Sequence, residues 1–243
     1  MILKFDKFIL CLSIFFIGCT TISNRNSKMS EKNFYTKNFS STINYYIDLP
    51  DDYCETNQYP LIVFLHGMGE RGNAQTISKL RATGLPAVID QKKLKLPFII
   101  VSPQCPETSS WISQLSNLES LTEYIIDNYP IDKKRVYLTG LSMGGYGTWM
   151  LGCTRSDLFA AIAPICGGGI QRYTYLLKDT PIWCFHGEDD DIVPLSESEK
   201  MVEALKNFGG NVKFTVYPGV KHNSWTATYE NPELYNWFLS ITK

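Results

Sequence analysis

A serine set among glycines is the clearest candidate for chemistry in this chain. Residues 140–144 read G-L-S-M-G; they follow the apolar run 135–140 and precede a glycine-rich, otherwise apolar segment. A serine in G-x-S-x-G between a strand and a helix sits on a strained turn with its hydroxyl exposed. The N-terminus of the following helix favours negative charge developing on that oxygen. We therefore expect Ser142 to be a nucleophile, with glycine required at 140 and 144 because side chains there would collide across the turn.

A serine hydroxyl needs a base to remove its proton, and the choice of base is narrow. The chain has three histidines, His66, His186 and His222. On this kind of architecture the nucleophile is followed along the chain first by the acid and then by the histidine. His222 alone follows Ser142 with an acidic cluster in between, the sequence HGEDDDIVP at residues 186–194. His222 is thus predicted to be the general base, and the acid to be one of the aspartates at 189–191.

These residues have to be positioned by a sheet, and the sequence alternates strand-like and helix-like segments. Apolar runs that predict strands lie at 42–50, 60–67, 97–104, 135–140, 159–169, 181–187 and 212–219. Their cores lack a polar face of period two, which is typical of parallel strands buried on both sides. Apolar residues at helical spacing predict helices over 115–128, 196–208 and 232–241. We expect an α/β fold with a mostly parallel central sheet and helices on both faces.

Composition excludes several other classes of protein. The chain has 243 residues, of which 44% are apolar, so it is neither disordered nor too short to bury a core. A net charge of −1 disfavours a nucleic-acid binder, and a mean hydropathy of −0.12 excludes a polytopic membrane protein. The cysteines form no C-x-x-C pair and no zinc spacing with histidine, so we expect neither a metal nor a cofactor.

The N-terminus is predicted to be a leader. Residues 1–18 combine a basic start with an apolar run too short for a membrane span, as in a signal peptide. The run ends in F-I-G-C at 16–19, which resembles a bacterial lipobox and predicts lipidation of Cys19. Residues 19–39 are then a polar tether and residues 40–243 the catalytic domain, exported and anchored at the periplasmic or cell-surface face of a membrane. An ordinary secretory signal or an uncleaved anchor is the alternative.

Taken together, five segments of the chain resemble the α/β-hydrolase superfamily. They are FLHGMGERGN at 64–73, VSPQCPETSSW at 101–111, GLSMGG at 140–145, HGEDDDIVP at 186–194 and HNSWTATYENPELYNWF at 222–238. Within the superfamily the chain is most similar to small bacterial esterases of the predicted-peptidase, phospholipase/carboxylesterase and polyhydroxybutyrate-depolymerase-like groups. The resemblance implies the α/β-hydrolase fold over about residues 40–241. The family acid is the aspartate of H-G-x-x-D-x-x-V-P, which is Asp190 here.

The resemblance also implies how the site works. Asp190 would hold the imidazole of His222 in the correct tautomer and stabilise its cation. Two backbone N–H groups would bind the oxyanion, one from Met143 after the nucleophile and one from Met68 in the loop after strand 60–65. His66 would be a structural element of that loop.

Substrate preference is indicated by loop lengths and aromatic residues. Residues 168–180, where a lid would usually be inserted, are few, so we expect no large cap domain and an open cleft. Such a cleft suits an ester group on a large molecule. Trp111 lines the substrate pocket or packs on the scaffold, whereas Trp225, Tyr229 and Trp237 are expected to anchor core and helices.

Three functions remain open. The first is a membrane-tethered serine hydrolase that cleaves carboxylic esters, either small molecules or acyl and feruloyl esters of carbohydrate. The second is a serine peptidase of the prolyl-oligopeptidase-like type, which the absence of a gating propeller sequence disfavours. The third is a non-catalytic binding module on the same fold. In each case we expect no nucleic-acid partner and contact with the membrane through the lipid alone.

Overall fold

The fold is organised around one eight-stranded sheet. The computed structural model describes residues 30–35 and 42–243. The strands are β1 (Ser30–Tyr35), β2 (Thr42–Asp48), β3 (Tyr59–Leu65), β4 (Ile99–Pro103), β5 (Ile131–Leu141), β6 (Ala161–Ile165), β7 (Ile182–Gly187) and β8 (Val212–Tyr217). Their order in the sheet is β1-β2-β4-β3-β5-β6-β7-β8. The pairings β1–β2 and β2–β4 are antiparallel and all others are parallel. The mostly parallel sheet predicted from the sequence is therefore confirmed.

One strand was not expected. Residues Ser30–Tyr35 form β1 and pair with β2 at the edge of the sheet, although we predicted them to belong to the polar tether. Pairing at a free strand edge depends on backbone N–H and C=O groups, which any sequence supplies. A missing apolar periodicity therefore could not exclude a strand here. Cys19 and the rest of the predicted leader lie outside the described residues.

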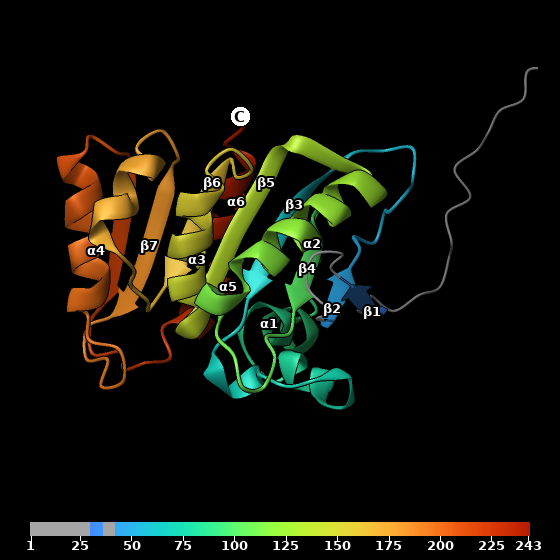
Figure 1. Ribbon diagram of the computed structural model, residues 1–243, viewed down its shortest axis with the longest axis horizontal. Coiled ribbons are helices and arrows are strands. Elements are labelled where there is room, and N and C mark those ends of the chain that lie inside the picture. The colour runs from blue at the N-terminus through green and yellow to red at the C-terminus, as the bar shows by residue number, and fades with distance from the viewer. Residues whose placement is uncertain (1–29, 36–41) are drawn as a thin grey trace, which may run out of the picture.

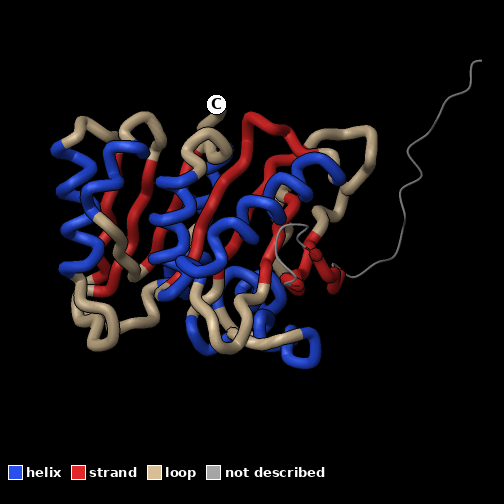
Figure 2. The backbone as a smooth tube through the Cα atoms, viewed as in Figure 1, coloured by secondary structure: helices blue, strands red, loops and turns tan. Residues whose placement is uncertain are grey.

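Helices cover both faces of the sheet, as Figures 1 and 2 show. The α-helices are α1 (Gly84–Lys92), α2 (Leu115–Asn128), α3 (Met143–Thr154), α4 (Ser196–Asn207), α5 (Trp225–Glu230) and α6 (Pro232–Leu239). Short 3₁₀ segments lie at Met68–Glu70, Ala74–Arg81, Trp111–Gln114 and Gln171–Leu177. Buried residues of α2, α3 and α4 belong to one core cluster, and those of α1, α5 and α6 to a second one on the opposite face.

Strand β3 illustrates why the central runs are continuously apolar. Leu61, Val63 and Leu65 belong to the first core cluster, while Ile62 and Phe64 belong to the second. All of β3 is buried, so each side chain needs to be apolar whichever way it points. Strand β8, at the edge of the sheet, is half-buried along most of its length.

The connections at the carboxyl ends of β3, β5, β7 and β8 carry the predicted site. Between β6 and β7 the chain forms only the short 3₁₀ segment Gln171–Leu177, so the described residues contain no large cap domain, as predicted. Among these described residues no helix combines the length and apolarity needed to cross a membrane.

Candidate active site

Ser142 lies on the sharp turn between β5 and α3. Its backbone has φ 54° and ψ −118°, a strained conformation for a residue with a side chain. The turn is tight enough that a Cβ at Gly140 would come within 2.5 Å of the carbonyl oxygen of Gly144, while a Cβ at Gly144 would strike the backbone of Leu65. The requirement for glycine at both positions is confirmed, and the turn presents the Ser142 hydroxyl at the start of a helix.

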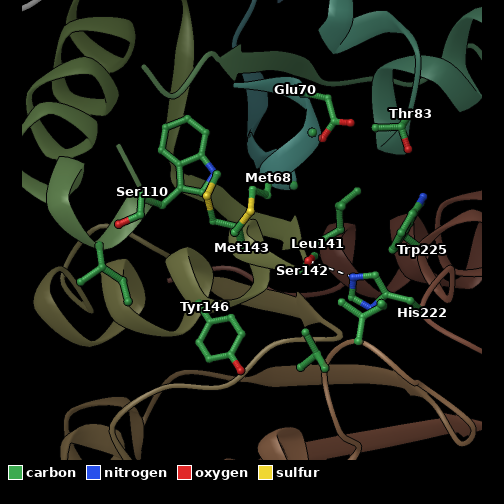
Figure 3. A pocket seen from close by; sticks show the side chains of 16 residues that line it. Met68, Glu70, Thr83, Ser110, Leu141, Ser142, Met143, Tyr146, His222 and Trp225 are labelled. Atoms are coloured by element: carbon green, nitrogen blue, oxygen red, sulfur yellow. Dashed lines mark hydrogen bonds between the residues drawn. The ribbon is translucent and has the colours of Figure 1, made fainter. Parts of the chain in front are cut away.

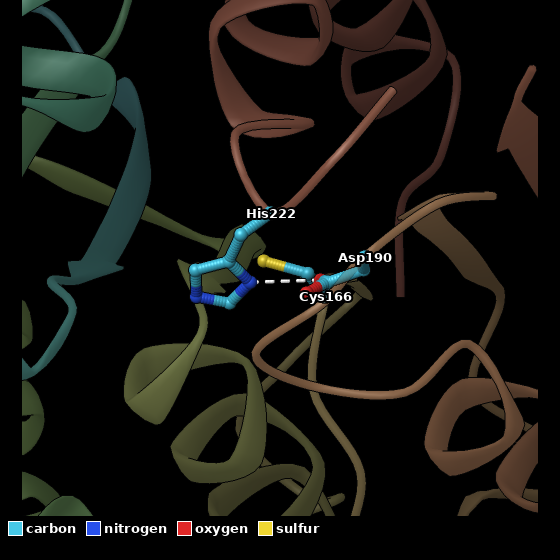
Figure 4. Close-up of side chains that lie close together, drawn as sticks. All are labelled: Cys166, Asp190 and His222. Carbon is cyan, nitrogen blue, oxygen red and sulfur yellow. Dashed lines mark hydrogen bonds and ion pairs between the residues drawn. The ribbon is translucent and has the colours of Figure 1, made fainter. Parts of the chain in front are cut away.

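The structure brings three predicted residues into one hydrogen-bonded line. The Nε2 atom of His222 lies 3.0 Å from Oγ of Ser142, and its Nδ1 atom lies 2.7 Å from Oδ2 of Asp190. Figure 3 shows the first contact and Figure 4 the second. The three residues come from the ends of β5, β7 and β8, which the parallel sheet places at a common edge.

The choice among the three aspartates is made by geometry. The side chain of Asp190 is fully buried, whereas Asp191 is exposed and pairs with Lys221 at 3.1 Å. Backbone N–H groups of Ile192 and Val193 each donate to Oδ1 of Asp190 at 2.9 Å. Burial raises the pKa of Asp190, but the hydrogen bond from His222 and these backbone donors outweigh burial and hold the pKa below its usual value. Asp190 is therefore an anion held against the imidazole.

The residues predicted to supply the oxyanion donors, Met68 and Met143, line the same pocket as Ser142. Met143 is the first residue of α3, and N–H groups in the first turn of a helix have no acceptor within that helix. Met68 follows Gly67, whose carbonyl oxygen accepts a hydrogen bond from Nδ1 of His66 at 2.5 Å. Because the peptide is trans, this bond turns the N–H of Met68 away from His66.

His66 is fixed by two further contacts. Its Nε2 atom accepts from the backbone N–H of Cys105 at 2.9 Å, so the ring proton must be on Nδ1. Burial lowers its pKa to about 4, which keeps the ring neutral. The indole N–H of Trp111 donates to the carbonyl oxygen of His66 at 2.9 Å, and the two rings meet edge to face. His66 is thus a structural element of the loop that carries Met68.

A pocket of about 530 Å³ opens beside Ser142. Its walls are largely apolar, and three of the side chains that line it are exposed: Met68, Ile112 and Ile192. Glu70 supplies a carboxylate to the wall, and burial raises the pKa of that carboxyl. Figure 3 shows Glu70 on the far side of Ser142 from Tyr146.

Two tryptophans of the site each combine packing with a place in the pocket wall. Trp111 lines the pocket and is also fully buried, so it both shapes the cavity and braces the His66 loop. Trp225 packs against the second core cluster, as expected of an anchor, and its ring also lies in the pocket wall, 5.3 Å from the ring of His222 and perpendicular to it. Trp225 begins α5 three residues after His222, and this spacing was the available signal.

A metal could in principle compete for the same atoms. Among the described residues, Cys166, Asp190 and His222 present ligand atoms within 4.8 Å of one another. Figure 4 shows the three side chains together. Burial raises the pKa of the Cys166 thiol to about 12, which disfavours the thiolate that metals bind. Oδ2 of Asp190 already accepts from His222 at 2.7 Å, and an ion would have to break that bond. The arrangement favours proton transfer over metal binding.

Comparison with known proteins shows the family of the chain. A model of the phospholipase/carboxylesterase family matches residues 99–233, more than half of the chain. The chain belongs to the phospholipase/carboxylesterase family. The match covers the segments that contribute Ser142, Asp190 and His222.

Individual relatives include esterases of different lengths. A bifunctional acetylxylan esterase/xylanase of Neocallimastix patriciarum is 30% identical over 73% of this chain and 26% of its own length. Acyl-protein thioesterase 1 of Gibberella zeae is 25% identical over 67% of this chain and 83% of its own. The crystal structure of a thermostable esterase superposes with a TM-score of 0.77 and 35% identity, covering 88% of this chain and 63% of that one. The chain thus spans about a quarter of the xylan-active relative and under two thirds of the esterase structure.

Proposed function

We propose that this protein is a serine hydrolase that cleaves carboxylic esters through an acyl-enzyme intermediate. The observation that carries the proposal is the line from Ser142 through His222 to Asp190, which ends at an open pocket. A serine, an imidazole and a buried carboxylate in hydrogen-bonding contact are the parts that acyl transfer requires.

In the first step His222 Nε2 takes the Ser142 proton while Oγ bonds to the ester carbonyl carbon. The resulting oxyanion lies against the N–H groups of Met143 and Met68. Each such donor typically contributes about 10² to 10³ in rate. The intermediate collapses, the bond to the alcohol breaks, and His222 returns its proton to the leaving oxygen. Water then attacks the acyl-serine by the same route and releases the acid, so that Ser142 is regenerated.

We further propose that the substrate is an acyl or feruloyl ester on carbohydrate. Two observations support this class. The pocket is open and has apolar walls, which fit a small acyl or aryl group and leave room for a bulky alcohol. The acetylxylan esterase/xylanase that resembles the chain is named for esters of this kind. The indole of Trp225, next to the imidazole that protonates the leaving group, offers a flat surface for a sugar ring.

The reaction class is tested with an active-site probe and two sets of substrates. A fluorophosphonate should label the wild type and the variant Ser113→Ala, a nearby exposed serine, but not Ser142→Ala. p-Nitrophenyl acetate should be turned over far faster than a panel of peptide p-nitroanilides. Faster cleavage of the anilides would establish the peptidase instead, and no labelling of the wild type would leave the non-catalytic binding module.

The substrate class is tested with acetylated and feruloylated xylo-oligosaccharides beside an S-acylated peptide. The last is included because the thioesterase relative is named for that linkage. Oligosaccharide esters should give the higher kcat/KM. A preference for the thioester would overturn the assignment to carbohydrate esters while leaving the serine mechanism intact.

We also propose that the chain is exported and held at a membrane by lipid on Cys19. The basic start, apolar run and F-I-G-C sequence support this localisation. Cells fed labelled palmitate should label the wild-type protein but not Cys19→Ala. A soluble, unlabelled wild-type protein would contradict the anchor.

A further inference from the structure

A second histidine lies behind the proposed triad. His186, near the end of β7, is fully buried, and its Nε2 atom lies 3.2 Å from Oδ2 of Asp190. The same oxygen accepts from Nδ1 of His222 at 2.7 Å. Oδ2 of Asp190 therefore lies between two imidazoles, while its Oδ1 accepts from two backbone N–H groups.

The contacts of His186 fix where its ring proton must be. Nε2 faces two acceptors, Oδ2 of Asp190 and the carbonyl oxygen of Val193 at 2.9 Å. Nδ1 faces the hydroxyl of Ser198 at 2.7 Å, and a hydroxyl both donates and accepts. Without a proton on Nε2, a lone pair would point at a carboxylate and a carbonyl in a buried site, which is strongly unfavourable. A proton on Nε2 can be shared between these two acceptors, and Nδ1 then has to accept from the hydroxyl of Ser198.

Burial, the largest influence on the pKa of His186, lowers it, so the ring carries a single proton. In this tautomer the single hydroxyl proton of Ser198 has to turn to the bare Nδ1, 2.7 Å away, from the carbonyl oxygen of Gly167, to which it otherwise donates at 2.8 Å. His66 has the opposite arrangement, because its Nε2 accepts from a backbone N–H. The two buried histidines are thus held in opposite tautomers by their surroundings.

We propose that His186 is a positioning residue whose Nε2–H donates to Asp190 from the side opposite His222. The inference rests on the proposed function, since it assigns His186 an effect on the proposed base. With this donor in place Asp190 is held on both oxygens and cannot rotate away from His222. The donor also draws charge from the carboxylate and so limits how strongly Asp190 stabilises the protonated form of His222.

The titratable groups around His186 are few. Asp190 and His222 face it from the loops after β7 and β8. Cys184 of β7 is linked to it through Ser198. Glu197 of α4 is directed instead toward Tyr146 and Lys200. Any change in pH response on replacing His186 therefore acts through Asp190.

The tautomer is tested directly by NMR of the full chain in detergent with histidine labelled with ¹⁵N. Three histidines give three imidazole rings to assign, each with two ¹⁵N signals. Long-range ¹H–¹⁵N correlation at pH 7.5 should show the proton of His186 on Nε2 and that of His66 on Nδ1. A bare Nε2 on His186 would overturn the proposal. The experiment needs no catalysis and should give the same result in Ser142→Ala, so it is independent of whether the proposed function holds.

The effect on the reaction is tested with two variants of His186 whose side-chain amides differ in length. In His186→Gln the amide reaches the place of Nε2 and can donate to Asp190, whereas in His186→Asn it stops near the place of Nδ1. We expect His186→Asn to lose about tenfold to hundredfold in kcat, because Asp190 loses a donor that keeps it from rotating away from His222, and a hydrogen bond to a charged group is worth about that much. KM should not change, and the acid limb of kcat/KM should move to higher pH. His186→Gln should recover most of both. Equal losses of kcat in the two variants, with the acid limb of kcat/KM unmoved, would mean that His186 only fills space, and would overturn the proposal.

Discussion

Replacing Asp190 by asparagine should remove most turnover while leaving the backbone unchanged. Oδ1 of Asp190 accepts two backbone N–H groups at 2.9 Å, and the amide oxygen of asparagine can keep both. Its NH₂ group then takes the place of Oδ2 and presents a hydrogen-bond donor to Nδ1 of His222. In the wild type Nδ1 is itself the donor, so two donors would face each other. The ring of His222 must shift its proton from Nδ1 to Nε2. In that tautomer Nε2 cannot take the proton of Ser142, 3.0 Å away.

The magnitude follows from the charge that disappears. In the transition state a carboxylate faces the His222 imidazolium, and opposite charges about 4 Å apart are worth about 4 kcal/mol at an effective dielectric constant of about 20. That corresponds to a loss of about 10³-fold in kcat. The assay is p-nitrophenyl acetate turnover, with circular dichroism to verify folding.

Asp191→Asn is the matched control for this loss. Its carboxylate is exposed and pairs with Lys221 at 3.1 Å, an interaction worth at most about 1 kcal/mol. Its kcat should stay within about twofold of wild type. An active Asp190→Asn beside an inactive Asp191→Asn would refute the assignment of the acid and the reasoning from tautomers.

Three further outcomes are expected. Gly144→Ala should lower the free energy of unfolding by about 3 kcal/mol or more and reduce labelling by fluorophosphonate, because its Cβ would strike the backbone of β3. Gly69→Ala is the control: its Cβ would meet open space, so neither stability nor labelling should change. Trp111→Phe removes the donor to the carbonyl oxygen of His66 and should cost about 1–3 kcal/mol in urea unfolding, with kcat falling more than KM rises. Burial, with Asp90 adding to it, raises the pKa of Asp48 to about 6, so the native state holds that proton more tightly than the unfolded chain and loses stability as pH rises through 6. Asp48→Asn should therefore raise Tm by about 5 °C at pH 8 and by little at pH 4; equal shifts at both pH values would contradict this cause.

Much of the fold was predictable because its strands are buried on both faces. Such strands have to be apolar at every position, as β3 is, and continuous apolar runs are easy to recognise. Helix α2 was predicted with the observed bounds, since its apolar stripe is regular and a proline follows it. Strand β1 was missed because an edge strand needs only backbone partners.

The site was predictable where spacing carries the information. The turn around Ser142 depends on the local pattern of glycines, and the order of His222 after the acidic cluster could be read along the chain. The place of Trp225 in the pocket wall was not predicted, because it depends on the direction in which α5 leaves the loop of His222. A residue pattern does not contain that direction.

The sequence by itself determined the candidate nucleophile, the candidate base and the layered α/β fold, because each depends on local residue types or on burial along a strand. Tertiary structure alone decided which of three neighbouring aspartates is buried against His222, and that His186 meets Asp190 from behind. Residues one position apart differ little in composition or propensity, but they point in different directions from a turn. Their chemistry therefore depends on which side chains the packed sheet brings to within 3 Å of each other.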